Sequence, residues 1–190
     1  TLRETEVFPL FFEFDKKFKS YLCTETIDPF LTAILPYAME FGFDVECKAP
    51  ISDEIYFNFT SDVIPVLSSF QNYIQIIAAG GIVDRKVLSS EAVGTGVSCG
   101  VDSLYTILSH LRKYEKALPK SHVLTHLVLM NAGSCSGKGG EESFKWFSEE
   151  VIQAQKVCRE LNLDLITIHT NLMEFYGIDH AHSGTMRMAG

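Results

Sequence analysis

The feature of this chain that most constrains its fold is an alternation of short apolar runs and helix-like segments after Gly81. Three runs read as strands: the short apolar run "AVGTGVS" at 92–98, the buried-type "HLVLMNA" at 126–132, and "DLITIHTN" at 164–171. Apolar residues at helical spacing separate them, namely Leu104, Ile107, Leu108 and Leu111, then Phe147, Val151, Ala154, Cys158 and Leu161. This order predicts a parallel sheet with right-handed crossovers, in which ligands bind beyond the carboxyl ends of the strands.

The segment before Gly81 is predicted to be mixed α+β. Residues 27–42 read as a helix, with Asp28 as its cap and Pro29 in its first turn. Pro36 is expected to kink or divide this helix, and Gly42 is expected to end it. Its predicted apolar face is Ile27, Phe30, Ile34 and Ala38.

Further short elements follow that helix. "FDVECKA" at 43–49 alternates as a half-buried strand, with Phe43, Val45 and Cys47 inward. A short helix is expected over 53–59 with Ser52 as its cap, a second helical stretch that Pro65 interrupts, and a strand over 73–79. We therefore expect an α+β segment over residues 1–85 and a second domain over residues 86–190.

Composition limits the function classes. The 190 residues carry a formal net charge of −8 and are 46% hydrophobic, which disfavours nucleic acid as a partner and is typical of a soluble globular protein. No apolar run is long enough to span a membrane. The five cysteines lack a CxxC pair, which favours a reducing compartment, so a cytoplasmic location is expected.

The stretch "GTGVSCGVDSLYTIL" at 94–108 places small residues directly before a regular helix. It is either an ordinary turn or a loop whose amides meet an anion at the helix start. A dinucleotide fingerprint fails because Cys99 occupies the third glycine position. The glycine-rich "GSCSGKGG" at 133–140 has the wrong spacing for a P-loop and carries Gly139 where a hydroxyl should follow Lys138.

"SCGVDS", Ser98 to Ser103, resembles the S-G-G-x-D-S pyrophosphate-binding loop of the ATP pyrophosphatase (PP-loop) family, whose domains are adenine nucleotide alpha hydrolase-like and include those of 7-cyano-7-deazaguanine synthase and asparagine synthetase. The motif follows a predicted strand and opens a predicted helix, as it does in that family. The resemblance implies a three-layer α/β/α fold with a parallel, Rossmann-like (HUP-type) sheet. The four-cysteine zinc cluster expected of a 7-cyano-7-deazaguanine synthase is absent from the sequence, so that specific assignment is unsupported.

The resemblance also implies roles for individual residues. The hydroxyls of Ser98 and Ser103 and the amides of Cys99, Gly100 and Val101 would hold the β and γ phosphates of ATP. Asp102 would fix the loop or magnesium. Cys99 departs from the family glycine, and because an L-residue avoids positive φ we expect the loop to take a conformation open to it. The adenine would rest against the strand end at Met130 and Asn131.

The reaction implied is adenylation of a small-molecule substrate with release of pyrophosphate, followed by displacement of AMP by a nitrogen or sulfur nucleophile, with ATP and magnesium as cofactors. The alternative is a non-enzymatic adenine-nucleotide-binding module with a degenerate loop. A purely structural α/β domain is a third interpretation. The sequence leaves a homo-oligomer open.

Three other features are candidates for chemistry. His169, at the end of the third predicted strand, is either an acid–base group on the substrate side or a histidine satisfied at a strand end. Asp179, His180 and His182 form either a metal cluster or a polar surface, and we expect the polar surface and no metal site. Cys135 is either a reactive thiol near Lys138 or an inert cysteine.

The strand count supports one more expectation. The family's sheet has five parallel strands, whereas the sequence supplies three after Gly81. We therefore expect residues 86–190 to be the N-terminal part of such a domain, with a solvent-open apolar edge that favours self-association.

Overall fold

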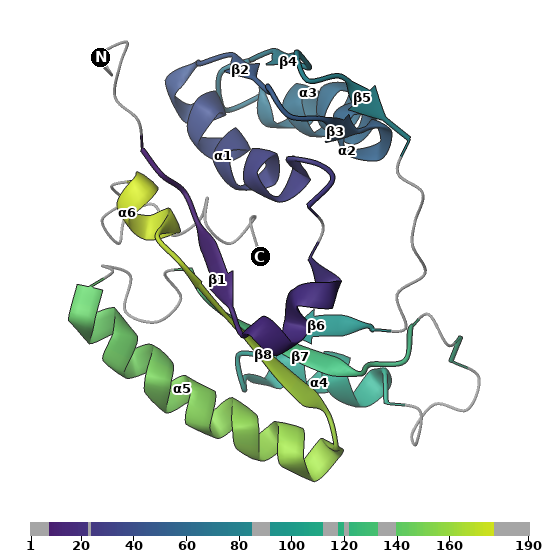
Figure 1. Cartoon of the computed structure of the whole chain (residues 1–190), viewed down its shortest axis with the longest axis vertical. Coiled ribbons are helices and arrows are strands. Elements are labelled where there is room, and N and C mark those ends of the chain that lie inside the picture. The colour runs from purple at the N-terminus through teal and green to yellow at the C-terminus, as the bar shows by residue number, and fades with distance from the viewer. Residues whose placement is uncertain are drawn as a thin grey trace. The chain divides into compact units, whose positions relative to one another are not determined.

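The computed structural model of this chain describes residues 8–22, 24–84, 92–111, 118–119, 122–132 and 140–176. These residues form two compact units (Figure 1). The sheet unit contains residues 8–21 and the described residues from 92 onward, and the small unit contains residues 22–84. The expected boundary at residue 85 stays a prediction, but residues 8–21 lie with the later unit.

The sheet unit is built on four strands in the order β1-β8-β7-β6. Their bounds are β1 Phe12–Phe14, β6 Gly94–Gly96, β7 His126–Asn131 and β8 Asp164–Thr170. The three strands expected after Gly81 are confirmed and are mutually parallel, with Gly94 opposite His126 and His126 opposite Asp164. Their carboxyl ends therefore meet at one edge of the sheet.

The strand β1 makes the sheet mostly parallel rather than wholly parallel. It pairs antiparallel with β8, with Phe14 opposite Ile168. The Asn171 side chain holds this segment in place, because its Oδ1 accepts the Phe11 N–H at 3.0 Å and its Nδ2 donates to the Pro9 carbonyl at 2.6 Å. This strand was not predictable from the sequence, since three residues are too few to show a period.

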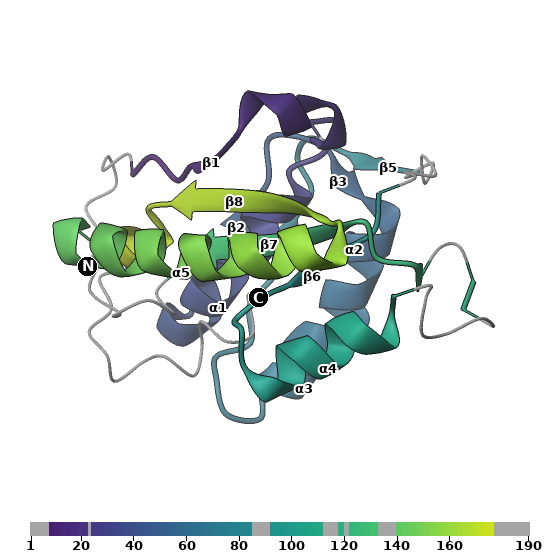
Figure 2. The ribbon, with the colours of Figure 1, turned by 90° about the horizontal axis from the view of Figure 1, so that it is seen from below.

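Two helices cover one face of this sheet. They are α4 Val101–Ser109 and α5 Gly140–Leu161, and shorter turns occur at η1 Lys16–Tyr21 and α6 Leu172–Tyr176. Figure 2 shows α5 lying along β7 and β8. The apolar face predicted for α5 is confirmed, and with α4 and β7 it forms one buried cluster: Val97, Ile107, Leu111, Leu124, Leu127, Leu129, Phe147, Ala154 and Cys158.

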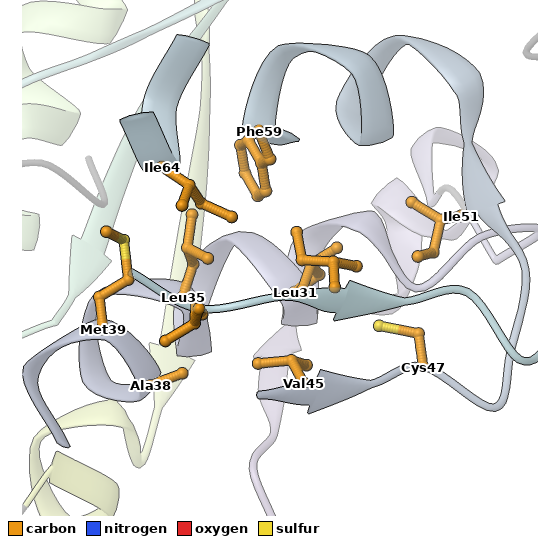
Figure 3. Close-up of a cluster of buried hydrophobic side chains, with 11 residues drawn as sticks. Leu31, Leu35, Ala38, Met39, Val45, Cys47, Ile51, Phe59 and Ile64 are labelled. Carbon is orange, nitrogen blue, oxygen red and sulfur yellow. The ribbon is translucent and has the colours of Figure 1, made fainter. Parts of the chain in front are cut away.

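The small unit packs helices against two pairs of very short parallel strands, β2 with β4 and β3 with β5. Its elements are α1 Asp28–Phe41, β2 Val45–Glu46, β3 Ile51–Ser52, α2 Asp53–Asn58, η2 Phe59–Val63, α3 Ile64–Leu67, β4 Ile76–Ile77 and β5 Ile82–Val83. Side chains of α1 meet those of the strands and of η2 and α3 in a second core (Figure 3). As predicted, the Ser52 hydroxyl caps α2 by accepting the Ile55 N–H at 3.2 Å.

The bounds of α1 agree with the sequence, and its predicted face is confirmed in part: Ala38 is buried, and Ile27 and Ile34 pack against the same core. Phe30 is exposed, and the fully buried side chains are Leu31, Leu35, Ala38 and Met39. The reason is that both faces of this helix are apolar, so periodicity could not tell which one the β2–β4 pair would cover. Gly42 ends the helix with φ +71°, as predicted.

Pro36 and Pro65 do not interrupt the helices at the positions that the sequence indicated. Pro36 lies within the continuous helix α1, and its ring is buried. Pro65 lies in the first turn of α3, where an N–H would lack an intrahelical partner in any case. The helical path from Asp53 to Leu67 changes type at η2 instead of stopping.

Asp28 does not cap its own helix, because the N-cap position is Ile27 and no side chain bonds there. Its buried Oδ1 accepts the N–H of Ser52 at 3.0 Å instead, which ties the start of α1 to β3. Asp28→Ala should therefore lower the free energy of unfolding by about 1–3 kcal/mol, because it leaves a buried N–H unpaired. Asp28→Asn retains the acceptor oxygen and should cost less in the same urea titration. Equal losses in the two variants would show that this hydrogen bond is not what Asp28 contributes.

Candidate nucleotide-binding loop

The candidate loop runs from Val97 to Gly100 and joins the carboxyl end of β6 to α4. Its first residue is fixed from two sides: the Val97 N–H donates to the Val128 carbonyl at 2.9 Å, and its side chain is buried in the core. The loop therefore begins from a rigid strand and reaches solvent at the edge where the parallel strands end.

Hydrogen bonds join the two serines of the motif across the loop. The Ser98 hydroxyl donates to the Ser103 hydroxyl at 3.2 Å, and the Ser103 hydroxyl donates to the Gly100 carbonyl at 3.0 Å. The Gly100 N–H points at Ser98 Oγ over 3.4 Å, which is a long contact. The two serines are five residues apart in sequence, but their hydroxyls lie next to each other on the exposed surface of the loop.

Cys99 has φ +55°, in the left-handed region. The expectation that the loop would take a conformation open to an L-residue is therefore wrong. Only one other described residue outside glycine, Asn162, has a positive φ. Gly100, in contrast, has φ −83° and ψ 169°, an extended conformation that any residue adopts. The position that calls for glycine is thus the one where this chain carries cysteine.

The start of α4 leaves its first N–H groups available. Gly100 is the N-cap residue and contributes no side-chain cap, so the amides of the first turn have no intrahelical acceptor. Val101 and Asp102 of that turn are exposed. A helix start with several N–H groups and the positive end of the dipole suits an anion.

Cys99→Gly removes the side chain from the left-handed position. It should keep or tighten pyrophosphate binding, because it clears the phosphate approach and retains the backbone path. Cys99→Val should weaken binding about tenfold, since a branched residue cannot hold this φ without a cost of roughly 1–2 kcal/mol. Isothermal titration with magnesium pyrophosphate measures both. A clear loss in Cys99→Gly would mean that the thiol itself has a role.

The thiols of the sheet unit differ in exposure. Burial, with smaller contributions from Asp164 and Cys99, raises the pKa of the Cys158 thiol. Cys158 is therefore protonated and inert near neutral pH, whereas Cys99 is exposed.

The strand-end candidates lie at the same edge of the sheet. Asn131 and His169 are register neighbours on β7 and β8, and Asn131 is buried while Met130 is half-buried. The His169 ring stacks on Phe144 at 5.2 Å between centroids and meets Phe147 edge-on at 4.9 Å. Its Nδ1 is buried without a hydrogen-bond partner.

Among the described contacts, none joins His169 to the loop of Ser98–Ser103. The buried Nδ1 therefore contradicts the alternative that His169 has its hydrogen bonds satisfied at the strand end. The described contacts do not bring His169 to the phosphate loop either. Phe144 was not among the predicted site residues. Its stacking on the histidine has no signal in sequence spacing, because the two residues lie 25 positions apart on different elements.

Other candidates fall outside the described residues: Cys135, Lys138, Asp179, His180 and His182. Within the described ranges, no three His, Cys, Asp or Glu side chains come together in a way that could hold a metal ion. None of the described helices is long and apolar enough to cross a membrane. No family model, no curated protein and no solved structure matches this chain.

Proposed function

We propose that this chain binds ATP through the loop of Ser98–Ser103 and belongs functionally with the ATP pyrophosphatases. The observation that carries the proposal is the φ of +55° at Cys99. The resemblance places glycine at this position, and a chain that kept the left-handed turn after losing the glycine is expected where the turn itself is needed.

The sheet supports the proposal in a second way. The parallel strands stand in the order β8-β7-β6, which is the 3-2-1 order of one half of a doubly wound fold. Both connecting helices pack into one cluster on the same face. We propose on this basis a Rossmann-like, HUP-type domain with three layers.

In the proposed reaction, a carboxylate, amide or ring carbonyl oxygen of a small-molecule substrate attacks the α-phosphorus of ATP. The bond from that phosphorus to the bridging oxygen of the β-phosphate breaks, and pyrophosphate leaves with the electron pair. A nitrogen or sulfur nucleophile then displaces AMP. The loop residues hold the pyrophosphate portion: the hydroxyls of Ser98 and Ser103 and the first-turn amides of α4 donate to its oxygens.

The residues of the loop could hold magnesium only together with the phosphates of ATP. Asp102 is a single exposed carboxylate on the first turn of α4, and no cluster of ligands surrounds it in the described residues. Magnesium is commonly held by one or two carboxylates together with substrate phosphates. Bound in that way, it would offset the charge that develops on the departing pyrophosphate.

His169 is the proposed proton carrier on the substrate side. Its ring contacts Phe144 and Phe147, and its buried Nδ1 has no hydrogen-bond partner. In the proposed role, the exposed Phe144 ring moves aside so that a substrate group reaches Nδ1 and exchanges a proton with it.

The substitution of cysteine for glycine favours a second candidate, a nucleotide-binding module without turnover.

The test is Asp102→Ala, with Glu149→Ala on α5 as the matched loss of one exposed carboxylate. Asp102→Ala should weaken binding of magnesium-ATP, and Glu149→Ala should not. Unchanged ATP affinity in Asp102→Ala contradicts the loop assignment. Pyrophosphate release by the wild-type chain with candidate substrates then supports the enzyme, whereas binding without release supports the module.

A further inference from the structure

The acidic character of this chain is concentrated in its small unit. Residues Leu22–Leu88 carry nine carboxylates and three basic side chains, against 24 and 16 in the whole chain. Lys48 is the single basic residue from Leu22 to Asp84. This unit therefore presents a strongly negative potential to approaching molecules, which the proposed ATP site does not explain.

A row of aromatic rings lies on the surface of the same unit, at the end of α1. The Tyr37 and Phe41 rings lie 4.7 Å apart between centroids, and the Phe41 and Phe43 rings stack at 6.1 Å. Phe41 is 53% exposed and Phe43 is 42% exposed. Three contiguous aromatic rings at the surface offer a platform that a folded protein does not need for its own core.

Negatively charged groups lie close to these rings along the chain. They sit at the carboxyl end of α1, where the helix dipole is negative, and its last turn has no basic residue. Glu40 follows Tyr37 by three positions and so lies on the same side of the helix. Asp44 adjoins Phe43, and the Gln75 N–H, donating to its Oδ1 at 2.8 Å, holds this carboxylate in place.

We propose that this aromatic-acidic surface, defined by Tyr37, Glu40, Phe41, Phe43 and Asp44, binds an arginine-rich segment of a partner protein. A guanidinium group stacks on aromatic faces and pairs with carboxylates, so it uses both properties of the surface at once. An apolar partner would bring no positive charge to this acidic unit. Nucleic acid and anionic lipid are repelled.

The test uses the full chain and a fluorescein-labelled peptide of alternating arginine and leucine, with a glutamate–leucine peptide of equal length for comparison. Fluorescence anisotropy should show saturable binding of the arginine peptide alone. Glu40→Gln with Asp44→Asn should weaken that binding at least fivefold, because both charges are lost while the acceptor for Gln75 remains. Asp53→Asn with Glu54→Gln removes two charges from α2 and should change binding less than twofold.

The aromatic contribution is tested in the same assay. Phe41→Ala should weaken binding at least fivefold, and Phe57→Ala, which removes an exposed ring from α2, should not. Circular dichroism checks that each variant is folded. Absence of saturable binding, equal loss in both charge pairs or equal loss in both phenylalanine variants overturns the proposal, since each would mean that no defined surface recognises the cation.

Discussion

Phe147→Ala should lower the free energy of unfolding of the sheet unit by about 3–5 kcal/mol, the usual cost of removing a fully buried phenylalanine. The Phe147 side chain is 1% exposed and lies in the cluster that joins α5 to β7. It also meets the His169 ring edge-on, so its loss opens a cavity below the strand end. Urea denaturation followed by circular dichroism measures the change.

Phe144→Ala is the matched control on the same helix. Phe144 is exposed and touches the same histidine by stacking, so its loss should cost about 1 kcal/mol, the worth of an aromatic pair. If the two substitutions lower the free energy of unfolding equally, the Phe147 side chain does not pack in the core.

Ser98→Ala combined with Ser103→Ala should weaken binding of magnesium-ATP by about 100-fold or more, because each of the two lost hydrogen bonds to a charged group contributes about 1.5–3 kcal/mol. The fold should be unaffected, since both hydroxyls are exposed and bond only within the loop. Titration calorimetry measures the affinity of the variant and of the wild-type chain.

Ser109→Ala provides the control for that pair. Ser109 ends α4, and its hydroxyl donates to the Tyr105 carbonyl at 2.8 Å, away from the helix start. Its loss should leave ATP affinity unchanged. An equal decrease in this variant would place the effect in the helix as a whole rather than in the serine pair.

The elements of this chain could be predicted where many residues share a period. The face of α5 and the strands β7 and β8 follow from apolar spacing, because the core accepts only one face of a long helix and a short apolar run is typical of a strand. The face of α1 could be predicted only in part, since apolar residues surround it: Ala38 is buried, but Phe30 is exposed. The strand β1 could not be predicted, because its place depends on Asn171, more than 150 residues away.

The candidate site was predictable in its position and only partly in its geometry. The order of strand, small residues and helix locates the loop at the strand ends. The pairing of Ser98 with Ser103 and the left-handed φ of Cys99 depend on how the backbone leaves β6, which composition does not encode. The two phenylalanines around His169 come from a helix that sequence spacing cannot align with β8.

The most direct test of the nucleotide-binding proposal is the thermal unfolding of the wild-type chain with magnesium and either ATP, AMP or pyrophosphate. A ligand that binds only the folded state raises the Tm in proportion to its affinity. ATP and pyrophosphate should both raise the Tm, and Ser98→Ala with Ser103→Ala should abolish that increase. An unchanged Tm with ATP and with pyrophosphate, each at millimolar concentration, would contradict the assignment of Ser98–Ser103 as a phosphate-binding loop.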